Sequence, residues 1–190
     1  MRPTFASLAQ AKNGKLTVTV DLLKHSAGGG GLGESRSVAR LTGGDSSLKL
    51  DAGQGDPPGM WVHYLETRAA YGISTSGETW SASGPFSGCQ IVIGKKDGQI
   101  YVAHLAQQSG STADQDWAGR GWRDEVWGRW KVPVPSDTFY SSSIVFVDWA
   151  AGNTPRSISV VRVDIKTKAM GGFDAAPMEI FNVVQLVNPE

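Results

Sequence analysis

The chain has 190 residues, with 18 basic and 18 acidic side chains, and this length predicts one domain, residues 1–190, with a buried core. Because the charges cancel, we expect neither a nucleic acid nor an anionic membrane as partner. The single cysteine cannot form an internal disulfide, and neither a cleavable signal pattern nor a membrane-spanning apolar run is seen, so we expect folding in a reducing compartment.

The first part of the chain predicts one short helix and then closely spaced strands. Residues 3–12 fit a helix with proline at its first position. The alternation in LTVTVDLL predicts a strand whose inward side chains are Leu16, Val18, Val20 and Leu22. The glycine-rich run after His25 has GxGxxG spacing, but no helix pattern follows, so we interpret it as a loop. Further strands are predicted at 36–41, 47–51 and 60–66.

The second part predicts a hairpin at 90–105, a weak helix that carries the tryptophans at 117, 122, 127 and 130, and three more strands. These strands are expected at 139–149, 157–168 and 178–187. Many strands, little helix and no internal repeat favour an α+β fold. We expect a mostly antiparallel β-sandwich or a curled mixed sheet with one or two flanking helices.

Cys89 is the candidate nucleophile, and His104 is its candidate base. A lone cysteine is more often a small buried hydrophobic residue. Here, however, Ser87 and Gly88 precede it and would let the backbone approach a substrate, with N–H groups that could hold an oxyanion. A thiol beside an imidazole that accepts its proton would be driven toward the thiolate. These residue types therefore indicate acyl transfer.

The register of the hairpin decides whether this pair shares a face. A four-residue loop at 95–98 would pair Gly94 with Gln99 and place Cys89 directly opposite His104. A two-residue loop keeps the same faces, whereas a three-residue loop would move His104 to the other face. We predict an even loop, because it brings four large apolar side chains to one core. These are Ile91, Ile93, Ile100 and Val102.

Residues Phe86, Ser87, Gly88 and Cys89, with His104 fifteen positions on, resemble the Leu-Ser-Gly-Cys motif and spacing of the bacterial glutamine deamidase toxins. This family includes the Burkholderia lethal factor and the catalytic domain of the cytotoxic necrotizing factors. The likeness to the lethal factor extends to chain length, to the early strand and to the tryptophan-rich segment after the histidine. In that toxin a threonine six residues before the cysteine completes the site.

At that position this chain has Ser83, which keeps the hydroxyl; Phe86 replaces the leucine of the motif. The resemblance implies that Ser83 or a backbone carbonyl orients His104. It also implies a cysteine-dependent protein glutamine deamidase that needs no cofactor or metal and acts as a toxin or effector. Its protein substrate would be a host regulator, either a DEAD-box translation-initiation helicase or a Rho-type GTPase. We expect a monomer made in the bacterial cytoplasm and delivered to the host cytosol.

Two other classes stay open. One is a non-catalytic, tryptophan-rich β-sandwich that binds a partner through exposed indoles. The other is a cysteine protease, which is disfavoured because Cys89 begins a strand rather than a helix. His25, His63 and Cys89 lack metal-ligand spacing, so no metal site is predicted. Asp148 and Asp164 lie in alternating strands where a solvent-facing acid is the default, and neither is assigned to His104.

Overall fold

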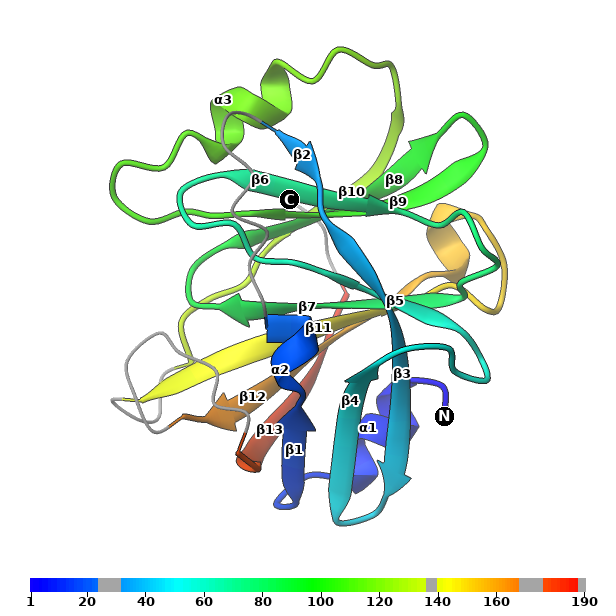
Figure 1. The fold of residues 1–190 in the computed structure, drawn as a ribbon, viewed down its shortest axis with the longest axis vertical. Coiled ribbons are helices and arrows are strands. Elements are labelled where there is room, and N and C mark those ends of the chain that lie inside the picture. The colour runs from blue at the N-terminus through cyan, green and yellow to red at the C-terminus, as the bar shows by residue number, and fades with distance from the viewer. Residues whose placement is uncertain (24–31, 136–139, 168–175, 188–190) are drawn as a thin grey trace.

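The computed structural model describes residues 1–23, 32–135, 140–167 and 176–187, and their strands form two sheets (Figure 1). The first sheet contains β1 (Lys15–Val18), β3 (Arg36–Gly44), β4 (Ser47–Ala52), β5 (Gly59–Val62), β7 (Trp80–Phe86), β11 (Ser141–Asp148), β12 (Ser159–Lys166) and β13 (Met178–Leu186). The second contains β2 (Gly33–Glu34), β6 (Ala69–Ile73), β8 (Gln90–Lys96), β9 (Gln99–Leu105) and β10 (Glu125–Lys131). The helices are α1 (Phe5–Gln10), α2 (Val20–Leu23), α3 (Ala113–Ala118) and a 3₁₀ turn at Pro155–Ser157.

The first sheet closes on itself into a barrel with the strand order β1-β13-β12-β11-β7-β5-β3-β4. Closure depends on β1, which pairs antiparallel with β13 and parallel with β4. The second sheet stays open, in the order β10-β8-β9-β6-β2. Most pairs are antiparallel, and β5 with β7 and β2 with β6 are the further parallel pairs among the described strands.

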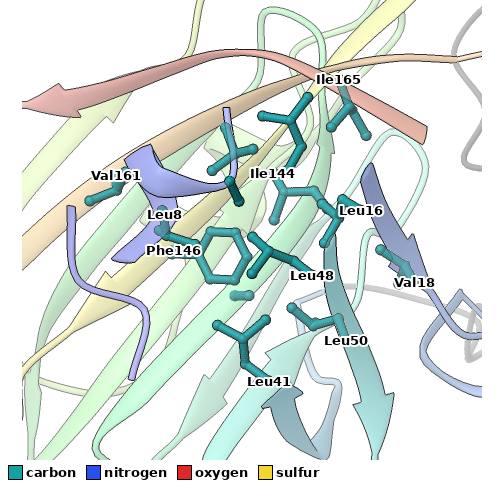
Figure 2. Close-up of a cluster of buried hydrophobic side chains, with 14 of the residues drawn as sticks. Leu8, Leu16, Val18, Leu41, Leu48, Leu50, Ile144, Phe146, Val161 and Ile165 are labelled. Carbon is teal, nitrogen blue, oxygen red and sulfur yellow. The ribbon is translucent and has the colours of Figure 1, made fainter. Parts of the chain in front are cut away.

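Three hydrophobic clusters hold these layers together. The first fills the barrel and is closed at one side by Leu8 of α1; Figure 2 shows Phe146, Leu16 and Leu48 pointing toward one another inside it. The second lies between the barrel and the open sheet, and includes Val145 of β11 and Ile91 of β8. The third covers the outer face of the open sheet, where α3 lies (Figure 1).

Strand β11 explains why both faces of the barrel wall are apolar here. Its alternate residues Ile144 and Phe146 point into the barrel, while Val145 and Val147 face the open sheet. All four side chains are fully buried. A strand covered on both faces is expected to be continuously apolar, and this one is.

The expectation of a mostly β fold with mixed sheets and few helices is confirmed, but a plain sandwich is not what forms. Because β1 bridges β4 and β13, the larger sheet has no free edge and becomes a barrel. The expected strand from residue 16 to 22 ends at Val18, and α2 follows it. Val20 is 55% exposed, contrary to its predicted inward position, whereas Leu22 is buried.

Two other segments differ from the sequence expectation. The tryptophan-rich segment is helical only over α3, and its second half is β10, which pairs along β8. The stretch around Ser83, where no strand was predicted, is strand β7 in the barrel wall. Both segments are strands because they pair with a neighbouring strand, and the local propensity of a segment does not predict such a partner.

The hairpin has an even register, as predicted, but its loop is shorter than the four-residue loop on which the exact pairing depended. Lys96 pairs with Gln99, so the loop consists of Asp97 and Gly98 alone. Their φ values of 51° and 83° are those of a type I′ turn, which matches the twist of the two strands. His104 therefore lies opposite Ile91, and the pairing of Gly94 with Gln99 is wrong. A shift of two residues leaves every side chain on its predicted face.

Some expectations fall outside the described residues. They are the glycine-rich loop at 24–31, including His25, and the strand ends predicted at 139 and 168. Within the described ranges, no helix has both the length and the apolar character needed to cross a bilayer.

Gly59 tests the packing of the barrel wall. It lies beside Trp80 on the neighbouring strand, and a Cβ at position 59 would overlap the indole ring. Gly59→Ala should therefore lower the free energy of unfolding by about 1–3 kcal/mol, measured by urea denaturation. Gly44→Ala, where the added methyl group meets no atom, is the control and should change stability by less than about 0.5 kcal/mol. Equal effects of the two substitutions would contradict the packing described.

Candidate active site

The candidate nucleophile lies where the chain passes from the barrel to the open sheet. Strand β7 ends at Phe86, and β8 begins at Gln90, so Cys89 ends the short connection between them. The residue after β10, Val132, fixes this connection in place: its C=O accepts from Gly88 N–H at 3.0 Å, and its N–H donates to Cys89 O at 2.9 Å. Gly88 has a φ of +91°, a backbone conformation that residues other than glycine rarely adopt.

His104 on β9 is linked to the barrel by one hydroxyl group. Ser83 Oγ lies 2.8 Å from Val62 O and 2.9 Å from His104 Nδ1. The carbonyl of Val62 can only accept, so the Ser83 hydroxyl proton is donated to it. The hydroxyl must then accept from His104 Nδ1–H. The neutral imidazole therefore carries its proton on Nδ1, and the lone pair of Nε2 is available as a base.

Of the two orienting groups that the sequence left open, the Ser83 hydroxyl is the one that contacts His104 among the described residues. Ser83 contacts the imidazole, and the Val62 carbonyl acts through Ser83 by determining the direction of its hydroxyl proton. Both side chains are buried, Ser83 fully and His104 to 99%, with 1% of its surface exposed. A buried polar group that loses its hydrogen-bond partner costs about 1–3 kcal/mol. This penalty stabilises the hydrogen bonds of Ser83 to Val62 and to His104.

Aromatic rings surround the imidazole. Phe86 stacks on it, with ring centroids 3.9 Å apart and an interplanar angle of 6°, and Tyr64 lies 5.2 Å away at 49°. The phenylalanine that replaces the leucine of the toxin motif thus has a flat contact that leucine could not make. Complete burial in these surroundings lowers the pKa of His104 to about 3, so the ring is neutral near pH 7.

Cys89 opens onto a cavity of about 230 Å³. Its walls are formed by Tyr64, Pro85, Ser87, Cys89 and Gln108. Only 7% of the Cys89 surface is exposed, and this burial raises the pKa of the thiol, although the backbone N–H groups of Gln107 and Ser87 act on the sulfur in the opposite direction. The expected thiolate is therefore wrong for the resting protein, because desolvation outweighs the nearby donors.

The thiol and the imidazole share a face without a direct bond. Cys89, Ile91 and His104 are on the side of the hairpin that faces the barrel. Among the described residues, no hydrogen-bond partner reaches His104 Nε2, although the atom is buried. A buried acceptor of this kind is rare in proteins and often marks a functional site.

The two predicted backbone donors, Ser87 and Gly88, have different partners in the structure. Ser87 N–H is directed at the sulfur of Cys89, and its role as an oxyanion donor stays a prediction. Gly88 N–H is already used by Val132 O, so Gly88 as an oxyanion donor is wrong. Sequence reasoning missed Gln107, Gln108, Tyr64 and Val62, because their part in the site depends on which strands become neighbours. The only local signal was the closeness of Gln107 and Gln108 to His104 in the chain.

The other candidates have structural partners elsewhere. Nε2 of His63 lies 2.8 Å from Ser37 Oγ. Both aspartates considered for His104 are buried rather than solvent-facing: Asp148 binds Arg2, and Asp164 binds Ser143 and Asn182. No cluster of metal-ligating side chains occurs in the parts of the chain that the structure describes. Of the four tryptophans, those at 117 and 130 are buried and those at 122 and 127 are half-buried, which favours packing over an exposed stacking face.

Comparisons with known proteins provide a distant structural likeness. No protein-family model matches the chain, and no curated protein matches it in sequence. The crystal structure of the C-terminal domain of CNFy from Yersinia pseudotuberculosis is similar, with a TM-score of 0.33 and 10% sequence identity. The match covers 68% of this chain and 62% of the CNFy domain, so this chain spans less than two thirds of the length of that domain. A likeness of this size establishes no family.

The buried His104 should make folding stability depend on pH. Its pKa is lowered to about 3 in the folded state, against about 6.5 when unfolded, so between these values the unfolded chain binds more protons. Stability should therefore fall as the pH drops below about 6.5, by at most about 1.4 kcal/mol per pH unit from this group. Urea denaturation of the wild type and of His104→Gln at several pH values measures the difference. Identical pH dependence in the two proteins would contradict a neutral buried imidazole.

Cys89 should rest as a protonated thiol rather than as a thiolate in an ion pair, so its alkylation should require a higher pH. Because burial raises the pKa of Cys89, its rate of reaction with iodoacetamide should still be rising above about pH 8.5, the pKa of an ordinary thiol. Intact-protein mass spectrometry reports this single cysteine directly, and Cys89→Ser is the control that gains no mass. A rate that levels off near neutral pH would indicate a preformed thiolate.

Proposed function

We propose that this protein is a cysteine-dependent glutamine deamidase that hydrolyses a side-chain amide of another protein. The observation that carries the proposal is the buried series of contacts from Val62 O through Ser83 to His104, which leaves Nε2 as an unpartnered base on the same face as Cys89. A nucleophile, a base and a group that orients the base are the components of covalent acyl transfer.

The reaction would proceed in two stages. Cys89 Sγ attacks the carboxamide carbon while its proton passes to His104 Nε2, and the C–N bond then breaks as His104 returns the proton to the departing ammonia. This leaves a thioester on Cys89. Water, activated by the same nitrogen, attacks the thioester and releases glutamate and the free thiol. Since both groups are neutral at rest, proton transfer accompanies the attack rather than preceding it.

The size of the cavity favours a side chain over an extended peptide. Its volume of about 230 Å³ is smaller than the range of about 300–1,000 Å³ typical of small-molecule pockets. A glutamine side chain presents one carboxamide on a short aliphatic stem, which suits such a space. A protease would need a groove for several residues of substrate backbone. The packing of the tryptophans likewise favours the catalytic proposal over a binding module.

The choice of substrate class also draws on the resemblance of the Phe86–Cys89 segment and His104 to the glutamine deamidase toxins. On that basis the proposed role is a toxin or effector that acts as a monomer in the host cytosol. The proposed target is a host regulator, such as a DEAD-box translation-initiation helicase or a Rho-type GTPase. Changing glutamine to glutamate adds a negative charge and removes two amide donors at the modified position.

The test is conversion of glutamine to glutamate in host-cell lysate treated with the active protein, mapped by peptide mass spectrometry. Cys89→Ala should abolish conversion, since the nucleophile is gone. His104→Gln should lower the rate by about 10²- to 10⁴-fold, the usual contribution of acid–base catalysis. Ser83→Ala should lower it less, because it disturbs the orientation of the base without removing it.

Gly44→Ala, distant in sequence and with no atom near its added methyl group, is the matched control and should keep full activity. Conversion that persists in the folded Cys89→Ala variant would refute the proposal. Complete and equal losses in Ser83→Ala and His104→Gln would make Ser83 an essential member of the site rather than an orienting one.

A further inference from the structure

A tyrosine outside the predicted catalytic set lies in the same cavity as the thiol. Tyr64 follows β5 by two residues, contacts the His104 ring and lines the cavity with Cys89 and Gln108. Its hydroxyl donates a hydrogen bond of 2.9 Å to Oε1 of Gln108. This oxygen belongs to a side-chain carboxamide, which is the chemical group that the proposed reaction attacks.

The tyrosine hydroxyl also remains a donor under all ordinary conditions. Burial, followed by the charge that Cys89 can carry, raises the pKa of Tyr64 to about 12. The phenol therefore stays protonated at neutral pH and well above it. A negative charge that develops in the cavity would strengthen the bond that it donates.

Three backbone N–H groups near the sulfur are already engaged. Acyl transfer creates a negative oxygen on the carbon bound to Cys89 Sγ, and this oxygen needs at least one hydrogen bond. Gly88 N–H is bound to Val132 O, and the N–H groups of Ser87 and Gln107 are directed at the sulfur itself. The hydroxyl of Tyr64 is the side-chain donor already bonded to a carboxamide oxygen in this cavity.

We propose that Tyr64 is a further catalytic residue, whose hydroxyl donates a hydrogen bond to the carbonyl oxygen of the substrate and to the oxyanion that forms from it. The carboxamide of Gln108 accepts this hydrogen bond in the structure and would be displaced when the substrate enters. The phenol keeps its proton throughout, so no proton is gained or lost by this step. The inference rests on the acyl transfer proposed above, but not on glutamine being the substrate.

The experiment compares two reagents that react with the same sulfur. Acylation by p-nitrophenyl acetate passes through an oxyanion, whereas alkylation by iodoacetamide displaces iodide and forms none. Tyr64→Phe should slow acylation by about 10²- to 10³-fold, the usual cost of losing one oxyanion donor, and leave alkylation within about two-fold of the wild type. Tyr71→Phe is the matched control; Tyr71 packs on Trp122 away from the cavity lining, and its loss of a hydroxyl should change neither rate.

The variant Gln108→Ala tests whether Gln108 competes with the substrate for the Tyr64 hydroxyl. Because the variant removes the Gln108 oxygen that competes with the substrate for the Tyr64 hydroxyl, its acylation rate should rise a few-fold, as expected for one neutral hydrogen bond of about 1 kcal/mol. Acylation that survives Tyr64→Phe unchanged, or falls together with alkylation, would overturn the proposal. A loss in Gln108→Ala as large as that in Tyr64→Phe would assign the donor role to Gln108 instead and would also overturn it.

These measurements distinguish failure of the inference from failure of the proposed function. A wild-type protein that is acylated in a Tyr64-dependent way but converts no glutamine in lysate supports Tyr64 and refutes the deamidase assignment. If Tyr64→Phe converts glutamine as well as the wild type does, the deamidase assignment is supported and the catalytic role of Tyr64 is refuted.

Discussion

Burial of the open sheet against the outside of the barrel is the constraint on which the rest of the structure depends. Ile91 and Val102 on the sheet meet Val145 and Phe86 on the barrel, and each fully buried side chain of this size contributes about 1.5–3 kcal/mol. The same contact brings a barrel strand that carries Ser83 against a sheet strand that carries His104. The candidate site is thus part of the contact between the two layers, and the hydrophobic energy of that contact holds it together.

Burial also determines the charge state of the site. Surrounded by aromatic rings and without an ionic partner among the described residues, His104 is neutral, and Cys89 is a thiol. Many cysteine enzymes keep a thiolate–imidazolium pair ready, but here the low polarity of the layer makes that pair costly. Under the proposed function, substrate binding would change this balance, because a carboxamide would bring dipoles into the cavity beside Tyr64 and the N–H groups of Ser87 and Gln107.

The hairpin illustrates how far sequence reasoning could reach. The turn residues at 95–98 predict a hairpin, and the alternation of Ile91, Ile93, Ile100 and Val102 predicts which face is buried. From these two signals the shared face of Cys89 and His104 follows, although the pairing predicted with Gly94 was displaced by two residues. By contrast, the strand that carries Ser83 has serine, glycine and proline at three consecutive positions and gave no strand signal. Its conformation comes from pairing with β5 and β11.

The sequence by itself determined the β-rich class and the shared hairpin face of Cys89 and His104, the candidate nucleophile and base; the resemblance to the deamidase toxins added Ser83. These depend on local periodicity, turn chemistry and residue type, which the chain carries everywhere along its length. Only the tertiary structure decided that the larger sheet closes into a barrel, that Val62 orients Ser83, that Gly88 N–H is used by Val132, and that Tyr64 and Gln108 complete the cavity. Each of these joins residues from separate strands or loops, and such neighbours are selected by the packing of the whole core rather than by any local pattern.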